Sequence, residues 1–460
     1  MLKRCALWLR NGFVRGRSLN ATRIVAASFA IIILVGALLL TLPIASRDGQ
    51  SAGFFTGLFT ATSSICVTGL ILVDTWTQWT LFGQVVILAM IQLGGLGFMT
   101  VVSLISFALH RRIGLSERLI MVSTLNLDSM DGVVRVVRHA LMGTFLLEGA
   151  GAVLMSLRLV PDFGLAGGLW RAVFHSVSAF CNAGFDLLGG RFGAFSSLAG
   201  YQDSPIMLGT TAALIAIGGL GFFVWEDILR ARCWGRLSVY SKMVLLITGL
   251  LIVGGAAFFF LEEYHNPATL GDMPVWEKAL NALFQSVTLR TAGYATVDQS
   301  LLTESAAAMS ILLMLIGGSS GSTAGGIKTA TLGVLLLSLR DGLRGRDTVV
   351  VRGRSIPQRK VLSAMTLTLV VLLLFLAGSM ALALMEGLSF VQAAFEIASA
   401  LGTVGLTMGV TPGLGVPGQL LVAGMMFLGR VGILSFSLAF LAQRRRDNKL
   451  RYPETNILVG

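Results

Sequence analysis

The chain has 460 residues, of which 55% are hydrophobic and only 13% are charged, and its mean hydropathy is +0.80. This composition excludes an ordinary water-soluble globular protein and favours an integral membrane protein surrounded by lipids. The formal net charge of +12 would suit a nucleic-acid partner or an anionic lipid patch. We expect no nucleic-acid partner, because the positive charges lie between apolar stretches and indicate membrane topology.

The basic residues mark one side of the membrane. Of the 35 Lys and Arg residues, 27 lie in five segments: 1–23, 111–138, 230–242, 340–360 and the residues after 443. The positive-inside rule places these segments, and with them both termini, in the cytoplasm. The first apolar stretch, 24–42, has about the 20 residues needed to cross a bilayer. A cleaved signal peptide is the alternative, but its apolar core would have only about 7 to 15 residues.

A short turn motif occurs four times along the chain. Its glycines are Gly69, Gly184, Gly293 and Gly405, at separations of 115, 109 and 112 residues. An apolar segment of about 12 to 15 residues precedes each turn, and this length indicates a re-entrant half-helix rather than a full span. Longer apolar segments flank each unit, at 24–42, 139–157, 243–261 and 361–385 before the half-helix and at 79–107, 205–229, 306–339 and 418–442 after the turn.

These units predict an all-α integral membrane fold of four tandem repeats, each a span, a re-entrant pore helix and a second span, with fourfold pseudo-symmetry around one pore. Both ends of each unit fall in basic segments, which is consistent with a multi-pass protein of the cytoplasmic membrane. The expected segments are a cytoplasmic N-terminus 1–23, repeat 1 at 24–110, a linker 111–138, repeat 2 at 139–232, repeat 3 at 233–341, a linker 342–360, repeat 4 at 361–443 and a cytoplasmic C-terminus 444–460.

The four turns have the chemistry of a potassium selectivity filter. Irregular backbone at membrane depth is tolerated where it lines a water-filled cavity, and rings of backbone carbonyls can replace the hydration shell of K⁺. Glycine allows the unusual dihedral angles that aim successive carbonyls inward. The candidate filter residues are Cys66, Val67, Thr68, Gly69, Cys181, Asn182, Ala183, Gly184, Arg290, Thr291, Ala292, Gly293, Gly402, Thr403, Val404 and Gly405.

Only the fourth turn has two glycines, Gly402 and Gly405, whereas the tetrameric potassium-channel filter has two in every strand. We therefore expect fewer well-defined ion sites and weaker discrimination against Na⁺ or Rb⁺. The alternative for the turn glycines is close helix packing in lipid, which four copies in register make a poorer explanation.

A second glycine signature lies in the trailing spans. It reads Gly-Gly-Leu-Gly-Phe at 94–98 and 218–222, and Gly-Arg-Val-Gly at 429–432. The third copy is replaced by a flexible run that cannot hold a regular helix. We expect this loop, within 317–328, to lie below the filter as a gate made of Gly317, Gly318, Ser319, Ser320, Gly321, Ser322, Thr323, Ala324, Gly325, Gly326 and Lys328.

Cationic side chains inside a membrane are functional candidates. Lys328 ends the loop, and Arg430 occupies a position that is glycine in the first two copies. We interpret Arg430 as an electrostatic barrier or a loop anchor, with a structural salt bridge to Glu396 or Glu148 as the alternative. Arg290 is expected to brace the filter by binding carbonyls.

Other chemistry finds little support in the sequence. The run 413–418 fits GxGxxG but follows no strand and contains proline, and the spacing at 321–329 departs from a phosphate-binding loop. The chain therefore shows no nucleotide site. Its acids are scattered and its four histidines do not cluster, so we expect no enzyme. The four cysteines fit no metal or disulfide spacing.

With these features in place, the sequence resembles the Trk/Ktr/HKT superfamily of potassium transporters over nearly all of its length. Within that superfamily, the segments 61–70, 290–294 and 452–460 are similar to KtrB-type ion-conducting subunits. The resemblance implies K⁺ as the transported ion, Na⁺ as an activator, a homodimer with one pore per subunit, and a cytoplasmic KtrA-type ring of nucleotide-binding subunits that sets the loop. Two alternatives stay open: a TrkH-type subunit, and a secondary cation transporter with broken helices.

Overall fold

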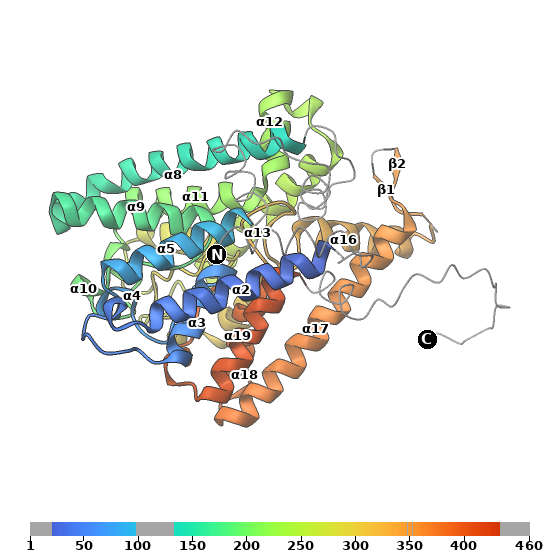
Figure 1. Cartoon of the computed structure of the whole chain (residues 1–460). Helices are drawn as coiled ribbons and strands as arrows, with labels where there is room; N and C mark the ends of the chain where they lie inside the picture. The colour runs from blue at the N-terminus through green and yellow to red at the C-terminus, as the bar shows by residue number, and fades with distance from the viewer. Residues whose placement is uncertain (1–20, 98–132, 347, 352, 433–460) are drawn as a thin grey trace.

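The structure is a computed structural model that describes residues 21–97, 133–346, 348–351 and 353–432. It is an assembly of helices with one small hairpin (Figure 1). The expected C-terminal segment 444–460, most of the N-terminal segment 1–23 and most of the linker 111–138 lie outside the described residues.

Four leading helices begin the repeats: α2 (Ala21–Thr41), α8 (Val133–Phe163), α13 (Val239–Glu262) and α17 (Gln358–Glu386). Within the described part of the chain, α13, α17 and the Val137–Phe163 part of α8 are long and apolar enough to cross a membrane. Their outer faces carry exposed leucines, among them Leu146, Leu250 and Leu384. Such apolar side chains suit a hydrocarbon surrounding.

Four short apolar helices, here called the half-helices, follow the leading helices: α3 (Phe54–Cys66), α9 (Leu165–Cys181), α14 (Val275–Thr288) and α18 (Phe390–Gly402). Each packs on the leading helix before it (Figure 1). One buried phenylalanine in each half-helix contributes to the common core: Phe59, Phe174, Phe284 and Phe395. The short helices predicted before the turns are therefore present.

The trailing segments consist of α5 (Leu81–Leu96), α11 (Pro205–Leu220) with α12 (Phe222–Ala231), α15 (Glu304–Leu315) with α16 (Thr329–Leu343), and α19 (Val416–Val431). Each one contacts the half-helix of the next repeat: α5 contacts α9, α11 contacts α14, α15 contacts α18, and α19 contacts α3. The last of these contacts returns to the first repeat, so the half-helices are enclosed in a closed circle of packing.

The trailing segments differ from the prediction of continuous spans with one interruption. The expected span 205–229 is not one continuous helix, because α11 and α12 meet at a bend of 93°. Gly221 at the bend has a φ of +91°, a left-handed conformation that glycine adopts without steric cost. Helices α5 and α19 likewise end before Gly97 and Gly432, which also have positive φ. The last glycine of the repeated signature therefore ends a helix in three repeats.

Side-chain caps start several helices. Ser204 caps α11, whose first residue is Pro205, and Ser389 forms a capping box with Gln392 at the start of α18. The remaining elements are short: α4 (Thr75–Gln78), α10 (Gly189–Phe192), η1 (Pro43–Ala45), η2 (Ala199–Tyr201), η3 (Trp234–Arg236), η4 (Gln299–Leu301), η5 (Thr411–Gly413) and the antiparallel strands β1 (Val350–Val351) and β2 (Arg354–Ser355).

Candidate functional site: four turns, a loop and an arginine

Each half-helix ends in a turn that reverses the backbone. The residue two before each turn glycine has a positive φ, which is 56° at Val67, 62° at Asn182, 69° at Thr291 and 53° at Thr403. The glycines themselves also have positive φ, from 71° to 98°. Two left-handed residues in each turn change the direction of successive peptide groups, which is the geometry that a filter segment needs.

The four turn glycines, here called the glycine ring, contact one another in a closed order. A Cβ atom added to Gly69 would lie 2.6 Å from the carbonyl oxygen of Ala183, and one added to Gly184 would lie 2.9 Å from that of Ala292. A Cβ atom added to Gly293 would lie 2.5 Å from the Val404 carbonyl oxygen, and one added to Gly405 would lie 2.1 Å from that of Thr68. Four segments that are more than 100 residues apart in sequence thus meet around one centre, and none has room for a side chain there.

Hydroxyl groups brace the turns, and the sequence analysis missed them. Ser63 Oγ accepts a hydrogen bond from the Gly69 N–H at 3.0 Å, and Ser399 Oγ accepts one from the Gly405 N–H at 3.0 Å. Ser178 Oγ accepts from the Phe185 N–H at 3.0 Å, whereas Thr288 Oγ1 donates to the Tyr294 carbonyl at 2.7 Å. A signal for them exists in the sequence, because each hydroxyl lies four residues after the buried phenylalanine of its half-helix.

The third turn is shorter than the others by one residue. Four residues separate Thr288 from Gly293, whereas five separate the hydroxyl residue from the glycine in each other repeat. Accordingly, the Ala292 N–H donates to the carbonyl four residues earlier, while the N–H of Thr68, Ala183 and Val404 donates to the carbonyl five residues earlier. The four walls of the ring are therefore not equivalent.

Arg290 lies in the shorter turn but does not bind the turn carbonyls as expected. Its Nη2 donates to the Gly317 carbonyl oxygen at 3.2 Å, and its Nε has no hydrogen-bond partner among the described residues. The side chain therefore links the third turn to the start of loop 317–328.

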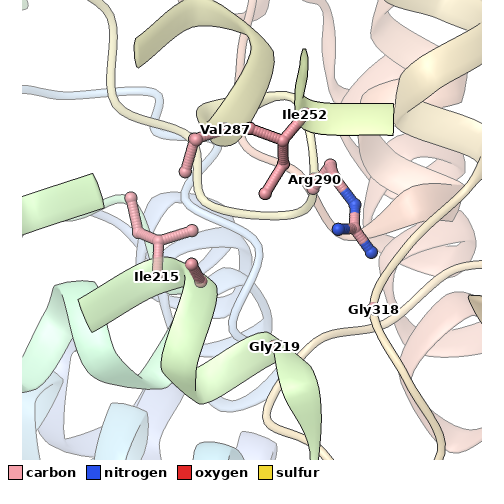
Figure 2. A pocket seen from close by; sticks show the side chains of 7 residues that line it. Ile215, Gly219, Ile252, Val287, Arg290 and Gly318 are labelled. Carbon is pink, nitrogen blue, oxygen red and sulfur yellow. The ribbon is translucent and has the colours of Figure 1, made fainter. Parts of the chain in front are cut away.

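A small pocket lies beside Arg290, between α11, α13 and α14 (Figure 2). Ile215, Ile252 and Val287 line it from these three helices, and the chain at Gly318 forms part of its wall. Figure 2 shows the guanidinium of Arg290 directed toward the loop segment at Gly318. On this side the loop borders a pocket of about 10 Å³, which is close to the volume that one water molecule needs.

The first glycine of the trailing signature serves close packing on a half-helix. A Cβ atom added to Gly94 would lie 2.1 Å from the Ile65 carbonyl oxygen. In the same way Gly218 approaches the Phe180 carbonyl at 2.2 Å, and Gly429 approaches the Leu401 carbonyl at 2.3 Å. The trailing helices therefore lie directly against the ends of the half-helices, just before the turns.

Loop 317–328 is held against the second and fourth repeats. The Ser319 N–H donates to the Gly219 carbonyl at 2.9 Å, and the Phe222 N–H donates to the Gly321 carbonyl at 2.9 Å, at the bend between α11 and α12. Thr323 Oγ1 donates to the Phe180 carbonyl at 3.2 Å. On the other side, a Cβ atom added to Gly325 would meet Thr403 Oγ1 at 2.1 Å. The loop therefore lies directly beside the second and fourth turns.

Internal bonds also stabilise this loop. A parallel bridge joins Ile316 to Ile327, and Ser319 Oγ and Thr329 Oγ1 are 2.8 Å apart. Lys328 Nζ donates to the Ala324 carbonyl at 2.7 Å. The ammonium group thus binds the loop's own backbone.

Arg430 joins three elements. Its Nη1 donates to the Thr323 carbonyl of the loop, and its Nη2 donates to the Gly94 carbonyl at the end of α5. The alternative of a salt bridge to Glu396 or Glu148 is wrong. Glu396 accepts from the hydroxyls of Thr407 and Thr411, and Glu148 accepts from Gln92.

An acidic side chain lies outside the ring. Asp186 follows Gly184 by two residues, and its Oδ1 accepts from the Leu188 N–H at 2.9 Å. Burial raises the pKa of Asp186 to about 7, and the nearby Asp74 carboxylate acts in the same direction. The sequence analysis missed this residue. No signal along the sequence indicates how strongly it is desolvated.

Comparison with known proteins identifies the family to which this sequence is similar. The family model described as "TrkH: Cation transport protein" matches residues 5–452. The potassium/sodium uptake protein NtpJ of Enterococcus hirae is 42% identical over 96% of this chain and 98% of its own. The Ktr system potassium uptake protein B of Bacillus subtilis is 38% identical over 95% and 96%, and that of Vibrio alginolyticus is 36% identical over 95% and 94%.

The fold has a solved counterpart. The crystal structure of the potassium transporter TrkH from Vibrio parahaemolyticus matches with a TM-score of 0.74, covering 93% of this chain and 86% of that one. At 18% sequence identity this likeness concerns the fold alone. The superfamily resemblance seen in the sequence is confirmed by the family match, and so is the expectation of a transporter rather than an enzyme. The chain belongs to the TrkH family of cation transport proteins.

Proposed function

We propose that the chain takes up K⁺ across the cytoplasmic membrane through one pore, with the four turns as its selectivity filter. The closed glycine ring carries this proposal. The carbonyls of Thr68, Ala183, Ala292 and Val404 each lie against the glycine of a neighbouring turn. Four carbonyl oxygens around one centre can replace part of the hydration shell of a cation without any charged side chain.

The surroundings of the ring support the same function. The half-helices end at the turns, so the negative ends of their dipoles point to the centre and favour a cation there. In all four repeats the trailing segment contacts the half-helix of the next repeat, and this shared contact supports fourfold pseudo-symmetry. One chain then forms one complete pore.

Loop 317–328 is the gate in this proposal, and Arg430 is its anchor. The loop binds beside the second and fourth turns, and the basic side chains of Arg430 and Lys328 both donate to its backbone. A cation leaving the ring toward the cytoplasm would be repelled until the loop moves. Because Arg430 donates to Thr323 and to Gly94, release of these two bonds is one step of opening.

The partners follow from the relatives. Proteins named for the Ktr system and for potassium uptake match this chain over nearly their full length, which supports K⁺ as the cargo and a separate regulatory subunit. We propose a KtrA-type cytoplasmic ring of nucleotide-binding subunits, a homodimer of this chain, and stimulation by Na⁺. Weaker discrimination against Na⁺ or Rb⁺ than in a tetrameric potassium channel is part of the proposal, since three turns have one glycine.

The test is K⁺-dependent growth and ⁸⁶Rb⁺ uptake in a bacterium that lacks its own potassium uptake systems, with and without a KtrA-type partner. Gly69→Ala should abolish both, because its Cβ would meet the Ala183 carbonyl and its φ is +96°. Gly424→Ala is the matched control, since nothing lies within 4 Å of its Cβ. Failure of the membrane-inserted wild type in every combination would refute potassium uptake.

A further inference from the structure

Two side-chain hydrogen bonds cross from the second turn to the third. The Tyr294 hydroxyl donates to Ser178 Oγ at 2.7 Å, and it also lies 3.3 Å from the Phe185 carbonyl oxygen. Asn182 Nδ2 donates to Thr291 Oγ1 at 3.3 Å. Ser178 in turn accepts from the Phe185 N–H. The second and third turns are therefore joined through polar groups, here called the cross-brace.

The two bonds flank the glycine ring along the ion path. Tyr294 directly follows Gly293, whereas Asn182 and Thr291 each precede their turn glycine by two residues. One bond therefore lies on the outer side of the ring and the other on the inner side. A change in the separation of Gly184 and Gly293 would have to stretch both.

Packing fixes the tyrosine in place. Its side chain is fully buried, and its ring packs against that of His175 at a tilt of 45°, with centroids 4.6 Å apart. His175 is itself buried and lies 3.2 Å from Thr211 Oγ1. Since the ring cannot rotate away, the hydroxyl stays directed at Ser178.

The remaining gaps between turns lack such bonds among the described residues. The hydroxyls of Thr68 and Thr403 are buried without a hydrogen-bond partner, and the residues that follow Gly69 and Gly405 are Leu70 and Leu406. Thr403 occupies the same position in its turn as Thr291 does. The cross-brace is thus a local feature of one gap.

We propose that Tyr294 and Asn182 are specificity-determining residues that fix the width of the filter at this gap. This inference rests on the proposed potassium pathway. A smaller cation such as Na⁺ binds well only if the carbonyls move inward, and the cross-brace resists that movement between the second and third turns. K⁺ fits the separation that the cross-brace maintains, so the two bonds favour K⁺ over Na⁺.

The test compares variants that remove one hydroxyl and change little else. Tyr294→Phe removes the outer bond, and Thr291→Val removes the acceptor of the inner bond while keeping a branched side chain. The readout is the ratio of the K⁺ and Na⁺ concentrations that half-inhibit ⁸⁶Rb⁺ uptake. Each variant should lower K⁺ preference by about threefold to tenfold, the factor that corresponds to one hydrogen bond of ordinary strength.

Two further variants separate the cross-brace from general effects. Tyr264→Phe removes a hydroxyl from an outer loop where it makes no hydrogen bond with the described residues, and should leave the ratio unchanged. Thr403→Val removes the equivalent hydroxyl from the fourth turn and should change the ratio less than Thr291→Val does. The thermal unfolding midpoint of each purified variant reports folding independently of transport.

The outcomes distinguish this inference from the proposed function. Wild-type protein that takes up no ⁸⁶Rb⁺ would refute the potassium pathway. Wild-type uptake together with an unchanged ratio in both Tyr294→Phe and Thr291→Val, in folded protein, would overturn the cross-brace alone. An equal fall in Thr403→Val and Thr291→Val would also overturn it, because the loss would then not depend on the bonded gap.

Discussion

The guanidinium of Arg430 donates a hydrogen bond to the backbone carbonyl of Thr323, and this bond ties α19 to loop 317–328. Arg430→Gln should release the loop and raise ⁸⁶Rb⁺ uptake measured without a regulatory partner. Arg430→Lys separates the role of electrostatic barrier from that of loop anchor. It keeps the positive charge but loses the planar guanidinium group that binds the carbonyls of Thr323 and Gly94 together. Because the contacts favour an anchor, we expect Lys to raise uptake nearly as much as Gln.

Arg158→Gln is the control for these variants, because Arg158 forms a partly exposed ion pair with Asp162 away from the ring. Unchanged uptake in Arg430→Gln, together with unchanged uptake after shortening 318–325, would exclude the loop as a gate. Low uptake in Arg430→Lys beside high uptake in Arg430→Gln would instead identify an electrostatic barrier.

The bend at Gly221 offers a second way to displace the loop. Gly221→Ala would force a side chain into a backbone with φ of +91° and bring its Cβ to 2.7 Å from the Ser320 carbonyl. We expect higher uptake without the partner and a smaller response when the partner is added. Gly209→Ala on the same helix meets nothing within 4 Å and should behave as wild type. Equal uptake in the two variants would show that docking at the bend does not restrain the loop.

Asp186 should make uptake depend on external pH. Because burial raises its pKa to about 7, the carboxyl is neutral below that pH and becomes negative as the pH rises through it. The negative charge attracts cations to the outer side of the ring, so uptake should increase by about twofold between pH 6 and pH 8, as expected for one unit charge at roughly 8 Å in water. The measurement is initial ⁸⁶Rb⁺ uptake at fixed K⁺ over this range.

Asp186→Asn should remove this rise, whereas Asp298→Asn, at an exposed residue that caps a short helix, should retain it. The charged groups that act on Asp186 include Asp74, and Tyr294 lies close enough to sense its charge. A pH profile that is the same in Asp186→Asn and wild type would assign the dependence to another group.

The turn hydroxyls should be important for stability. Ser399→Ala would leave the buried Gly405 N–H without its acceptor, at a cost of about 1 to 3 kcal/mol in the free energy of unfolding. Ser379→Ala is the matched control, because that buried hydroxyl donates only to a carbonyl of its own helix. Thermal unfolding in detergent should show a clearly lower midpoint for Ser399→Ala than for Ser379→Ala. Equal midpoints would mean that the turn does not need this bond.

Much of the architecture could be predicted from the sequence, because it depends on patterns that sequence displays directly. Glycines spaced by about 112 residues indicated the four turns, apolar length indicated the short helices, and the run around Ser319 indicated the interrupted segment. The bend at Gly221 was missed because a glycine-containing apolar helix and a bent pair of helices have the same composition.

The partners of the buried cations could not be predicted. Arg430 and Arg290 bind backbone carbonyls, and every residue carries a carbonyl, so no residue type identifies the acceptor. The sequence therefore left a carboxylate such as Glu396 open as an alternative partner of Arg430, although hydroxyls already bind that carboxylate. The turn hydroxyls of Ser63 and its three counterparts could have been predicted from the sequence, since each lies four residues after the buried phenylalanine of its half-helix.

The shorter third turn affects how the cation preference of such a protein can change by mutation. In an assembly of four identical chains, one mutation alters all four walls of the conduction path at once. Here each wall is encoded separately, and the turn that contains Arg290 already has one peptide group fewer than the others. In the proposed filter, a single substitution therefore changes one quarter of the ion's surroundings, so that preference among cations can be adjusted in small steps while the other three walls continue to hold the ion.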